Sequence, residues 1–170
     1  SFCSPDVCKG CKSCIKGEKL VLFIGGKCSR NCWYCSLSKN RKNSPQAFAN
    51  ERPIKNSKEL IQEAIESNSK GAGITGGDPL VYFKKTIQYA KALKRKFGKN
   101  FHIHIYLPLV LVSEKKLLKL KKYIDEIRFH PSFLIDNSNQ EEEIEKIKLA
   151  SKIFGKENTG IEVPMIPEKK

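Results

Sequence analysis

The chain has 170 residues, of which 39% are hydrophobic and 29% are charged, and this composition predicts one soluble globular domain with a sizeable core. No apolar run is long enough to span a membrane, and no apolar stretch typical of a signal peptide precedes the first cysteine, so we expect a cytoplasmic protein without a membrane partner. The net charge of +14 makes RNA an alternative binding partner. Only five of the 32 basic residues are arginine, however, and arginine is the residue that phosphate-binding proteins prefer.

The chain starts with a cysteine-rich segment, residues 1–18, in which the apolar residues follow no period. Residues 19–24 are a short apolar run that ends at two glycines, which predicts a buried parallel strand. A loop with three cysteines follows at 28–35. Residues 36–56 are polar and contain prolines, so we predict that they are irregular.

From residue 57 onward, helical and strand-like patterns alternate. The predicted elements after this point are a helix from 57 to 65 with Ser57 as its N-cap, helices at 81–97, 113–123 and 140–154, and strands at 71–75, 101–106, 126–130 and 160–166. This alternation predicts an α/β fold of parallel βαβ units, with five strands and four helices in all. The sheet stops one strand short of a six-stranded partial barrel and therefore looks truncated after strand five.

All seven cysteines lie within the first 35 residues, in two groups. Disulfides join distant segments, whereas the ligands of one metal centre cluster, so the clustering and the odd number favour metal binding in a reducing compartment. Cys28, Cys32 and Cys35 have the spacing C-x3-C-x2-C, which suits three corners of a cube-shaped [4Fe–4S] cluster. The fourth iron then has no protein ligand and is open to a substrate or cofactor.

The other group, Cys3, Cys8, Cys11 and Cys14, places four thiols within twelve residues, enough for a complete metal site. Four thiolates fit either a second [4Fe–4S] cluster or a tetrahedral zinc ion, and the sequence leaves both open. We therefore divide the chain into a metal-binding segment, residues 1–18, and a core domain, residues 19–170.

The segment from Cys28 to Cys35 resembles the signature of the radical S-adenosylmethionine (SAM) superfamily, in which an aromatic residue usually precedes the last cysteine, as Tyr34 does here. The resemblance covers about residues 19–166. With the cysteine-rich start and the segment 73–79, it extends to an uncharacterised group of archaeal proteins related to pyruvate formate-lyase activating enzymes. It implies a partial (β/α) barrel, a [4Fe–4S] cluster, SAM, and a ferredoxin- or flavodoxin-like electron donor.

Gly76, Gly77 and Asp78 follow the second predicted strand, where the family has a motif of two glycines and a glutamate. The resemblance implies that these residues present backbone groups to the amino end of SAM, and glycines permit such a close approach. It also implies that the ring of Tyr34 lies beside the adenine, whereas Trp33 is interpreted more simply as a packing residue.

Polar residues at the ends of later strands are expected to face the same cavity. His104 and Tyr106 end the third strand, and Arg128 and His130 share one face of the fourth. The resemblance implies that such residues bind the carboxylate and ribose of SAM. At the fifth strand, Glu162 and Val163 lie where the family holds the adenine, although Pro164 departs from its pattern.

The resemblance thus implies an enzyme that reductively cleaves SAM to methionine and a 5′-deoxyadenosyl radical, which abstracts hydrogen from a small-molecule or protein substrate. One alternative is a radical SAM enzyme that modifies RNA such as tRNA, motivated by the charge of +14. Another is a non-catalytic iron–sulfur or zinc binding module. The sequence does not specify the substrate.

Overall fold

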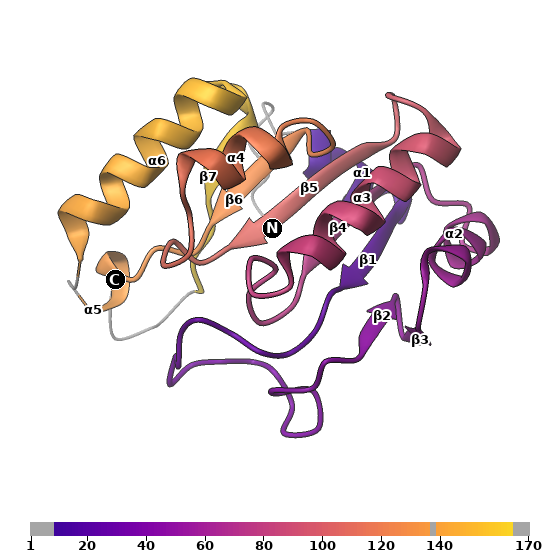
Figure 1. Cartoon of the computed structure of the whole chain (residues 1–170), viewed down its shortest axis with the longest axis horizontal. Helices are drawn as coiled ribbons and strands as arrows, with labels where there is room; N and C mark the ends of the chain where they lie inside the picture. Colours follow the sequence, from indigo (N-terminus) through magenta and orange to yellow (C-terminus); the bar gives the residue numbers. More distant parts are fainter. Residues whose placement is uncertain (1–8, 137–138, 165–170) are drawn as a thin grey trace.

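The structure is a computed structural model and describes residues 9–136 and 139–164 (Figure 1). Its elements are, in chain order, α1 (Lys9–Ile15), β1 (Lys19–Phe23), β2 (Ala47–Ala49), β3 (Arg52–Ile54), α2 (Ser57–Glu66), β4 (Gly71–Thr75), α3 (Phe83–Phe97), β5 (His102–Leu107), α4 (Glu114–Leu120), β6 (Glu126–Phe129), α5 (Phe133–Asp136), α6 (Gln140–Phe154), the 3-10 helix η1 (Lys156–Asn158) and β7 (Thr159–Ile161).

A mostly parallel sheet forms the centre of the fold. Across the described residues it has seven strands in the order β3-β2-β1-β4-β5-β6-β7. β1, β4, β5, β6 and β7 are mutually parallel, and these are the five strands that the sequence predicts. The predicted α/β fold is therefore confirmed. The strands β3 and β7 end the sheet on opposite sides, so the barrel is partial and not closed.

One face of the sheet carries the hydrophobic core. Because side chains alternate across a strand, Leu20, Leu22, Ile103 and Ile105 all point to this face and are fully buried. Apolar side chains of α2, α3, α4 and α6 join the same core, and Figure 1 shows α3, α4 and α6 on that side of the sheet. This burial is the main source of stability for the fold.

The opposite, inner face is polar. It carries Lys19, His102, His104, Glu126 and Arg128, which alternate with the core residues along the parallel strands. The helix α1 lies on this face, across the sheet from the other helices (Figure 1). The sequence did not predict this helix, because its seven residues show no apolar period.

The prediction of irregular structure for 36–56 is wrong in its second half, where β2 and β3 form an antiparallel hairpin beside β1. Asn50 forms the turn with a positive φ of 52° and donates its backbone N–H to the Val21 carbonyl at 2.7 Å. Pro53 is tolerated because β3 is an edge strand, where a residue without an N–H breaks no ladder.

Two further boundaries differ from the predictions. The N-cap of α2 is Asn56 and not Ser57, because the Asn56 side chain accepts hydrogen bonds from the backbone N–H groups of Lys58 and Glu59 at 2.9 and 3.1 Å. The fifth parallel strand ends at Ile161 rather than at 166, and the last part of that prediction, 165–166, lies outside the described residues. Among the helices of the described chain, none is long and apolar enough to cross a membrane.

Candidate metal and cofactor site

The cysteine loop leaves β1 at the carboxyl edge of the sheet. Cys28, Cys32 and Cys35 all line a cavity of about 600 Å³ at this edge. The Arg30 N–H donates to the Cys28 sulfur at 3.4 Å, and the Cys35 N–H donates to the Cys32 carbonyl at 3.2 Å. Burial raises the pKa of the Cys28 thiol, and the hydrogen bond from Arg30 partly opposes this shift. All three cysteines of the loop thus lie around the same cavity.

The predicted glycine turn follows β4 and lies at the same cavity. Gly76 and Gly77 line the cavity, and the Gly77 N–H donates to the Gly25 carbonyl at 2.9 Å. Gly76 has a φ of +148°, which favours glycine. A Cβ on Gly77 would lie 2.5 Å from the Gly26 carbonyl oxygen and 2.6 Å from that of Lys27. Glycine is required here because two backbone segments pass in direct contact.

Asp78 has a different place from the one expected. It is fully buried, and it does not belong to the residues that line the cavity. Its carboxylate accepts a hydrogen bond from the Ser29 hydroxyl at 2.6 Å and another from the Leu80 N–H at 2.8 Å. Burial raises the pKa of Asp78, and these two hydrogen bonds oppose the shift. The structure therefore uses Asp78 to join the glycine turn to the cysteine loop.

The two aromatic residues of the cysteine motif differ in exposure. Tyr34 lines the cavity, and its hydroxyl accepts a hydrogen bond from Arg30 at 3.4 Å. Trp33, interpreted from the sequence as a packing residue, makes an edge-to-face contact with Tyr34 but is 73% exposed. Trp33 therefore lies at the surface beside the site and not in the core.

The carboxyl ends of β6 and β7 close another side of the cavity. His130, Glu162 and Val163 all line it. The His130 Nδ1–H donates to the Glu162 carbonyl at 2.6 Å, and Arg30 donates to the His130 carbonyl at 2.8 Å. These contacts connect the cysteine loop to the far strands of the sheet.

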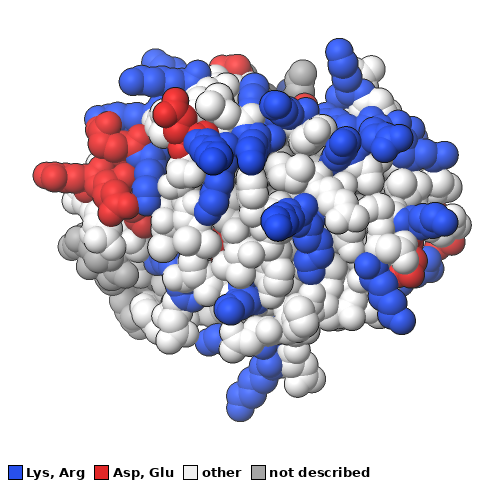
Figure 2. Space-filling view, in the orientation of Figure 1, with Lys and Arg blue, Asp and Glu red and all other residues white. Residues whose placement is uncertain are grey.

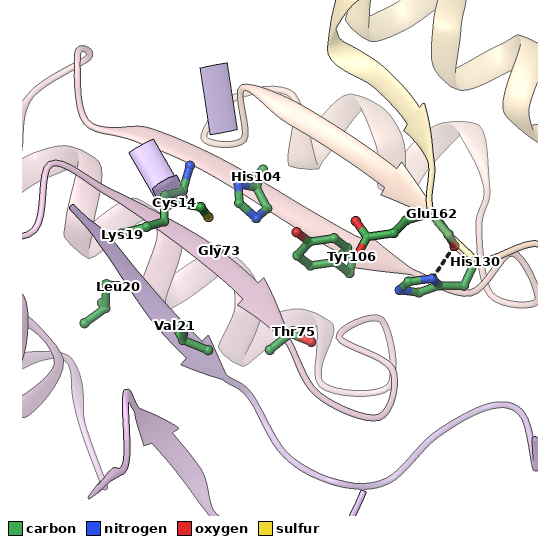
Figure 3. Close-up of a pocket in the computed structure, with 10 residues that line it drawn as sticks. All are labelled: Cys14, Lys19, Leu20, Val21, Gly73, Thr75, His104, Tyr106, His130 and Glu162. Atoms are coloured by element: carbon green, nitrogen blue, oxygen red, sulfur yellow. Dashed lines mark hydrogen bonds between the residues drawn. The ribbon is translucent and has the colours of Figure 1, made fainter. Parts of the chain in front are cut away.

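Figure 3 shows a second cavity, of about 300 Å³, on the inner face of the sheet. Cys14 of α1 and His104 and Tyr106 of β5 contribute to its walls. The two cavities adjoin, because three residues line both: Thr75, His130 and Glu162. His104 and Tyr106 are thus placed deeper in the barrel than the cysteine loop.

His104 does not reach the cavity of the cysteine loop. It is 2% exposed, and within the described part of the chain its Nδ1 has no hydrogen-bond partner. Burial, followed by the charges of Lys19 and Arg128, lowers the pKa of His104 to about 3. The imidazole is therefore neutral near pH 7.

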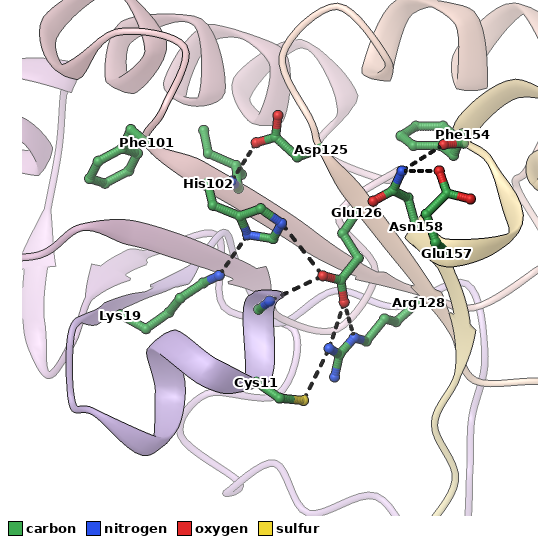
Figure 4. Close-up of polar contacts among 12 residues, drawn as sticks. Cys11, Lys19, Phe101, His102, Asp125, Glu126, Arg128, Phe154, Glu157 and Asn158 are labelled. Carbon is green, nitrogen blue, oxygen red and sulfur yellow. Dashed lines mark hydrogen bonds and ion pairs between the residues drawn. The ribbon is translucent and has the colours of Figure 1, made fainter. Parts of the chain in front are cut away.

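Arg128 is directed at Glu126 and Cys11 (Figure 4). It does not line that cavity, and its guanidinium donates to the Glu126 carboxylate at 2.6 Å and to the Cys11 sulfur at 3.2 Å. The structure thus brings Tyr34, Gly76, Gly77, His130 and Glu162 together with the three cysteines of the loop, and places Asp78, His104 and Arg128 elsewhere.

The N-terminal cysteines are described only in part. Cys11 and Cys14 lie on α1 as free thiols, whereas Cys3 and Cys8 lie outside the described residues. Within 9–136 and 139–164, no three Cys, His, Asp or Glu side chains gather closely enough to bind one metal ion. A cluster binds each thiolate through a different iron, so three thiols arranged around a cavity suit a [4Fe–4S] cluster better than a single ion.

One residue that supports the site was not predicted from the sequence. The Tyr82 hydroxyl accepts from the Lys27 N–H at 3.1 Å and donates to the Ser44 carbonyl at 3.3 Å. It thereby joins the two ends of the segment between β1 and β2, which contains the cysteine loop. The only sequence signal is its position a few residues after the glycine turn, which does not distinguish it from a core tyrosine.

Comparison with known proteins gives two findings. The family model described as the Radical SAM superfamily matches residues 22–155. A protein of Methanocaldococcus jannaschii, provisionally named a glycyl-radical enzyme activating enzyme, is 46% identical over 164 residues. The alignment covers 94% of this chain but 43% of the relative, so the chain spans less than half of that protein's length.

Proposed function

Because the chain belongs to the radical SAM superfamily, we propose that Cys28, Cys32 and Cys35 bind a [4Fe–4S] cluster and that SAM occupies the adjoining cavity. The observation that carries this proposal is that the three thiols and the Gly76–Gly77 turn line one cavity. A small cofactor needs such a concave site with convergent polar groups.

The chain's own residues bind and orient the cofactor in this proposal. The backbone of Gly76 and Gly77 lines the cavity beside the amino end of SAM, and because the Gly77 N–H already donates to the Gly25 carbonyl, we expect carbonyl oxygens of this turn to accept from the amine. Tyr34 provides an aromatic surface for the adenine, and His130 and Glu162 provide polar groups in the same cavity. When bound, the cluster and SAM supply reductive cleavage of the sulfonium bond and hydrogen abstraction.

For the substrate, we propose a glycine residue of a partner enzyme, from which hydrogen is removed to leave a protein radical. The support is the name of the M. jannaschii relative, a glycyl-radical enzyme activating enzyme. The electron donor proposed for this reaction is ferredoxin- or flavodoxin-like. The alternative is a small-molecule substrate, and an activity assay with candidate proteins and small molecules would distinguish the two.

The RNA alternative rests on the net charge of +14. Figure 2 shows Lys and Arg side chains spread over one face of the molecule, with acidic side chains near one end. The name of the relative points to a protein substrate and gives no support to RNA. A tRNA-binding titration tests this alternative, because phosphate contacts make affinity fall steeply with salt.

The test of the proposed function is SAM cleavage. The anaerobically reconstituted protein, reduced with dithionite, is expected to convert SAM to methionine and 5′-deoxyadenosine. Cys32→Ser removes one thiolate ligand and is expected to abolish this product, whereas Cys14→Ser preserves the three-cysteine loop and is expected to retain it. If the wild-type protein holds four irons at this loop but forms no 5′-deoxyadenosine, the alternative of a non-catalytic iron–sulfur module is correct.

A further inference from the structure

The cysteine loop has one side that lines the cavity and another that faces solvent. Tyr34 and Cys35 line the cavity, whereas Trp33, which directly precedes them, does not belong to its lining residues. Trp33 is the single tryptophan of the chain and is 73% exposed. Tryptophan is enriched where proteins bind one another, because its large ring buries much apolar area at an interface. Cys35 is exposed as well, so the three-cysteine site lies directly behind this part of the surface.

The solvent-facing side of the loop is also basic. Residues 19–50 contain six Lys and Arg residues and no Asp or Glu. Lys27 directly precedes Cys28 in the chain. Lys39 follows Cys35 by four residues, so the chain allows their Cα atoms to be at most about 14 Å apart. Both lysine side chains are exposed, and positive charge therefore lies on either side of the cysteine motif.

The charges of these two lysines are not neutralised by the protein itself. Arg41 of the same segment pairs with Glu51, whereas Lys27 and Lys39 form no ion pair within the described part of the chain. In Figure 1 the segment between β1 and β2 runs along the lower margin of the molecule. Figure 2, in the same orientation, shows Lys and Arg side chains and no acidic ones among the described residues of that margin. This surface is therefore complementary in charge to an acidic partner.

We propose that Lys27, Trp33 and Lys39 form a docking surface for an acidic one-electron redox protein, and we call these three residues the outer loop surface. The inference rests on the proposed function, because it requires a cluster at the loop that has to be reduced. One electron passes from the donor to the cluster. The donor is thereby oxidised, the cluster is reduced, and no bond forms or breaks at the outer loop surface.

An electron donor fits the outer loop surface better than the substrate does. A substrate has to enter the cavity for its hydrogen to be removed, but none of the three residues lines that cavity. An electron crosses a thin layer of protein without a channel, so its donor needs to reach only the outer side of the loop. Electron-transfer contacts are small and transient, and complementary charge speeds their formation. One exposed aromatic ring with lysines beside it suits such a contact.

The test measures binding of an acidic ferredoxin and an acidic flavodoxin to the anaerobically reconstituted full chain by isothermal titration calorimetry. Lys27→Glu combined with Lys39→Glu reverses both charges, and we expect it to weaken binding about tenfold at low salt. Trp33→Ala removes the exposed ring and is expected to weaken binding about fivefold. Binding to the wild-type protein should itself weaken as salt is added, because salt screens exposed charges.

A matched control separates the outer loop surface from the net charge of the molecule. Lys91→Glu combined with Lys96→Glu makes the same change in charge at two exposed positions of α3, on the outer side of the sheet. Charges beyond the screening length contribute little, so we expect this control to bind the donor within about twofold of wild type at 0.1 M salt. All four lysines are exposed, so neither double variant disturbs the core.

The source of the electron distinguishes docking from the chemistry of the site. With reduced ferredoxin below saturation, we expect the Lys27 and Lys39 double variant to form 5′-deoxyadenosine about tenfold more slowly than wild type, in line with its weaker binding. With dithionite, which needs no protein interface, the two rates should be equal. If dithionite-reduced wild type forms no 5′-deoxyadenosine, the proposed function fails, whereas the binding comparison still tests the outer loop surface.

Three results would overturn the proposal. The first is a wild-type protein that binds neither acidic donor at low salt. The second is equal donor binding by the Lys27 and Lys39 double variant and the α3 control. The third is a double variant that loses affinity for tRNA while its affinity for the donors is unchanged, since that result would assign the outer loop surface to RNA.

Discussion

At the scale of single residues, the neighbours of two ionisable side chains, Asp78 after β4 and Arg128 on β6, decide the roles of these side chains. Asp78 binds Ser29 and Leu80, Arg128 binds Glu126 and Cys11, and none of these contacts follows from position in the sequence. Most of the residues that line the cavity at the cysteine loop lie in loops beyond the ends of the strands, with Thr75 at the end of β4 as an exception.

His104 gives a prediction for the pH dependence of stability. Its pKa is about 3 in the folded protein and about 6.5 in the unfolded chain, so between these values the unfolded chain binds more protons. Its contribution to stability is therefore complete above about pH 6.5 and is lost as the pH falls toward 3. The metal-free wild-type protein should lose up to about 1.4 kcal/mol per pH unit more than His104→Gln in this window.

Urea unfolding of both proteins at several pH values between 7.5 and 4 measures this difference. Comparison with His104→Gln is needed because buried carboxylates such as Asp78 also titrate in the acid range. Parallel pH profiles for the two proteins would show that His104 is protonated in the folded state or exposed to solvent.

At the scale of elements, the site depends on contact between two loops. The loop after β1 and the turn after β4 are joined by backbone hydrogen bonds from Gly77 to Gly25 and from Asp78 to Lys27, at 2.9 and 3.0 Å. β1 and β4 are parallel neighbours, so their carboxyl ends bring the two loops together. The register of two strands thereby places the glycine turn beside the cysteines.

Gly77→Ala tests this contact. The added Cβ would meet the carbonyl oxygens of Gly26 and Lys27, so we expect the variant to lose about 1–3 kcal/mol of unfolding free energy. It should also retain less iron at the cysteine loop after reconstitution. Gly160→Ala is the matched control, because its Cβ would come no closer than 3.7 Å to Arg128. Equal iron content in both variants would mean that the loops can separate without disturbing the cysteines.

At the scale of the whole molecule, the hydrophobic core lies on one face of the sheet, whereas Cys28, Cys32 and Cys35 lie at its carboxyl edge. The core is formed by apolar residues of the strands and outer helices, and among the described residues it includes no cysteine. We therefore expect burial of these residues to stabilise the fold without bound metal, in contrast to small metal-dependent domains.

Removal of the metal should accordingly leave the fold intact. We expect chelator-treated protein to retain its far-UV circular dichroism and a cooperative thermal transition. The variant with Cys28, Cys32 and Cys35 changed to Ala should melt within about 4 °C of the metal-free wild type, which corresponds to about 1 kcal/mol for a chain of this size. A non-cooperative transition in either sample would show that a metal centre is needed for folding.

The sequence by itself determined the family, the five parallel strands and four of the helices, α2, α3, α4 and α6. These features depend on local signals, since cysteine spacing, strand-like runs and helical periodicity all lie within short windows of residues. The family match over residues 22–155 and the parallel pairing of β1, β4, β5, β6 and β7 confirm them. The hairpin at 47–54 was not predicted, because its two short strands contain no repeated pattern and one holds Pro53.

Only the tertiary structure decided which polar residues face the cavity at the cysteine loop and which face the N-terminal segment. The alternation of residues along a predicted strand shows which side chains share a face. It does not show how deep in the barrel each side chain lies or which element packs over it. Arg128 and His130 share a face of the fourth predicted strand, yet His130 lies at the cavity and Arg128 under α1, beside Cys11. The position of α1 inside the barrel arises from contacts between residues more than a hundred positions apart, which no local pattern encodes.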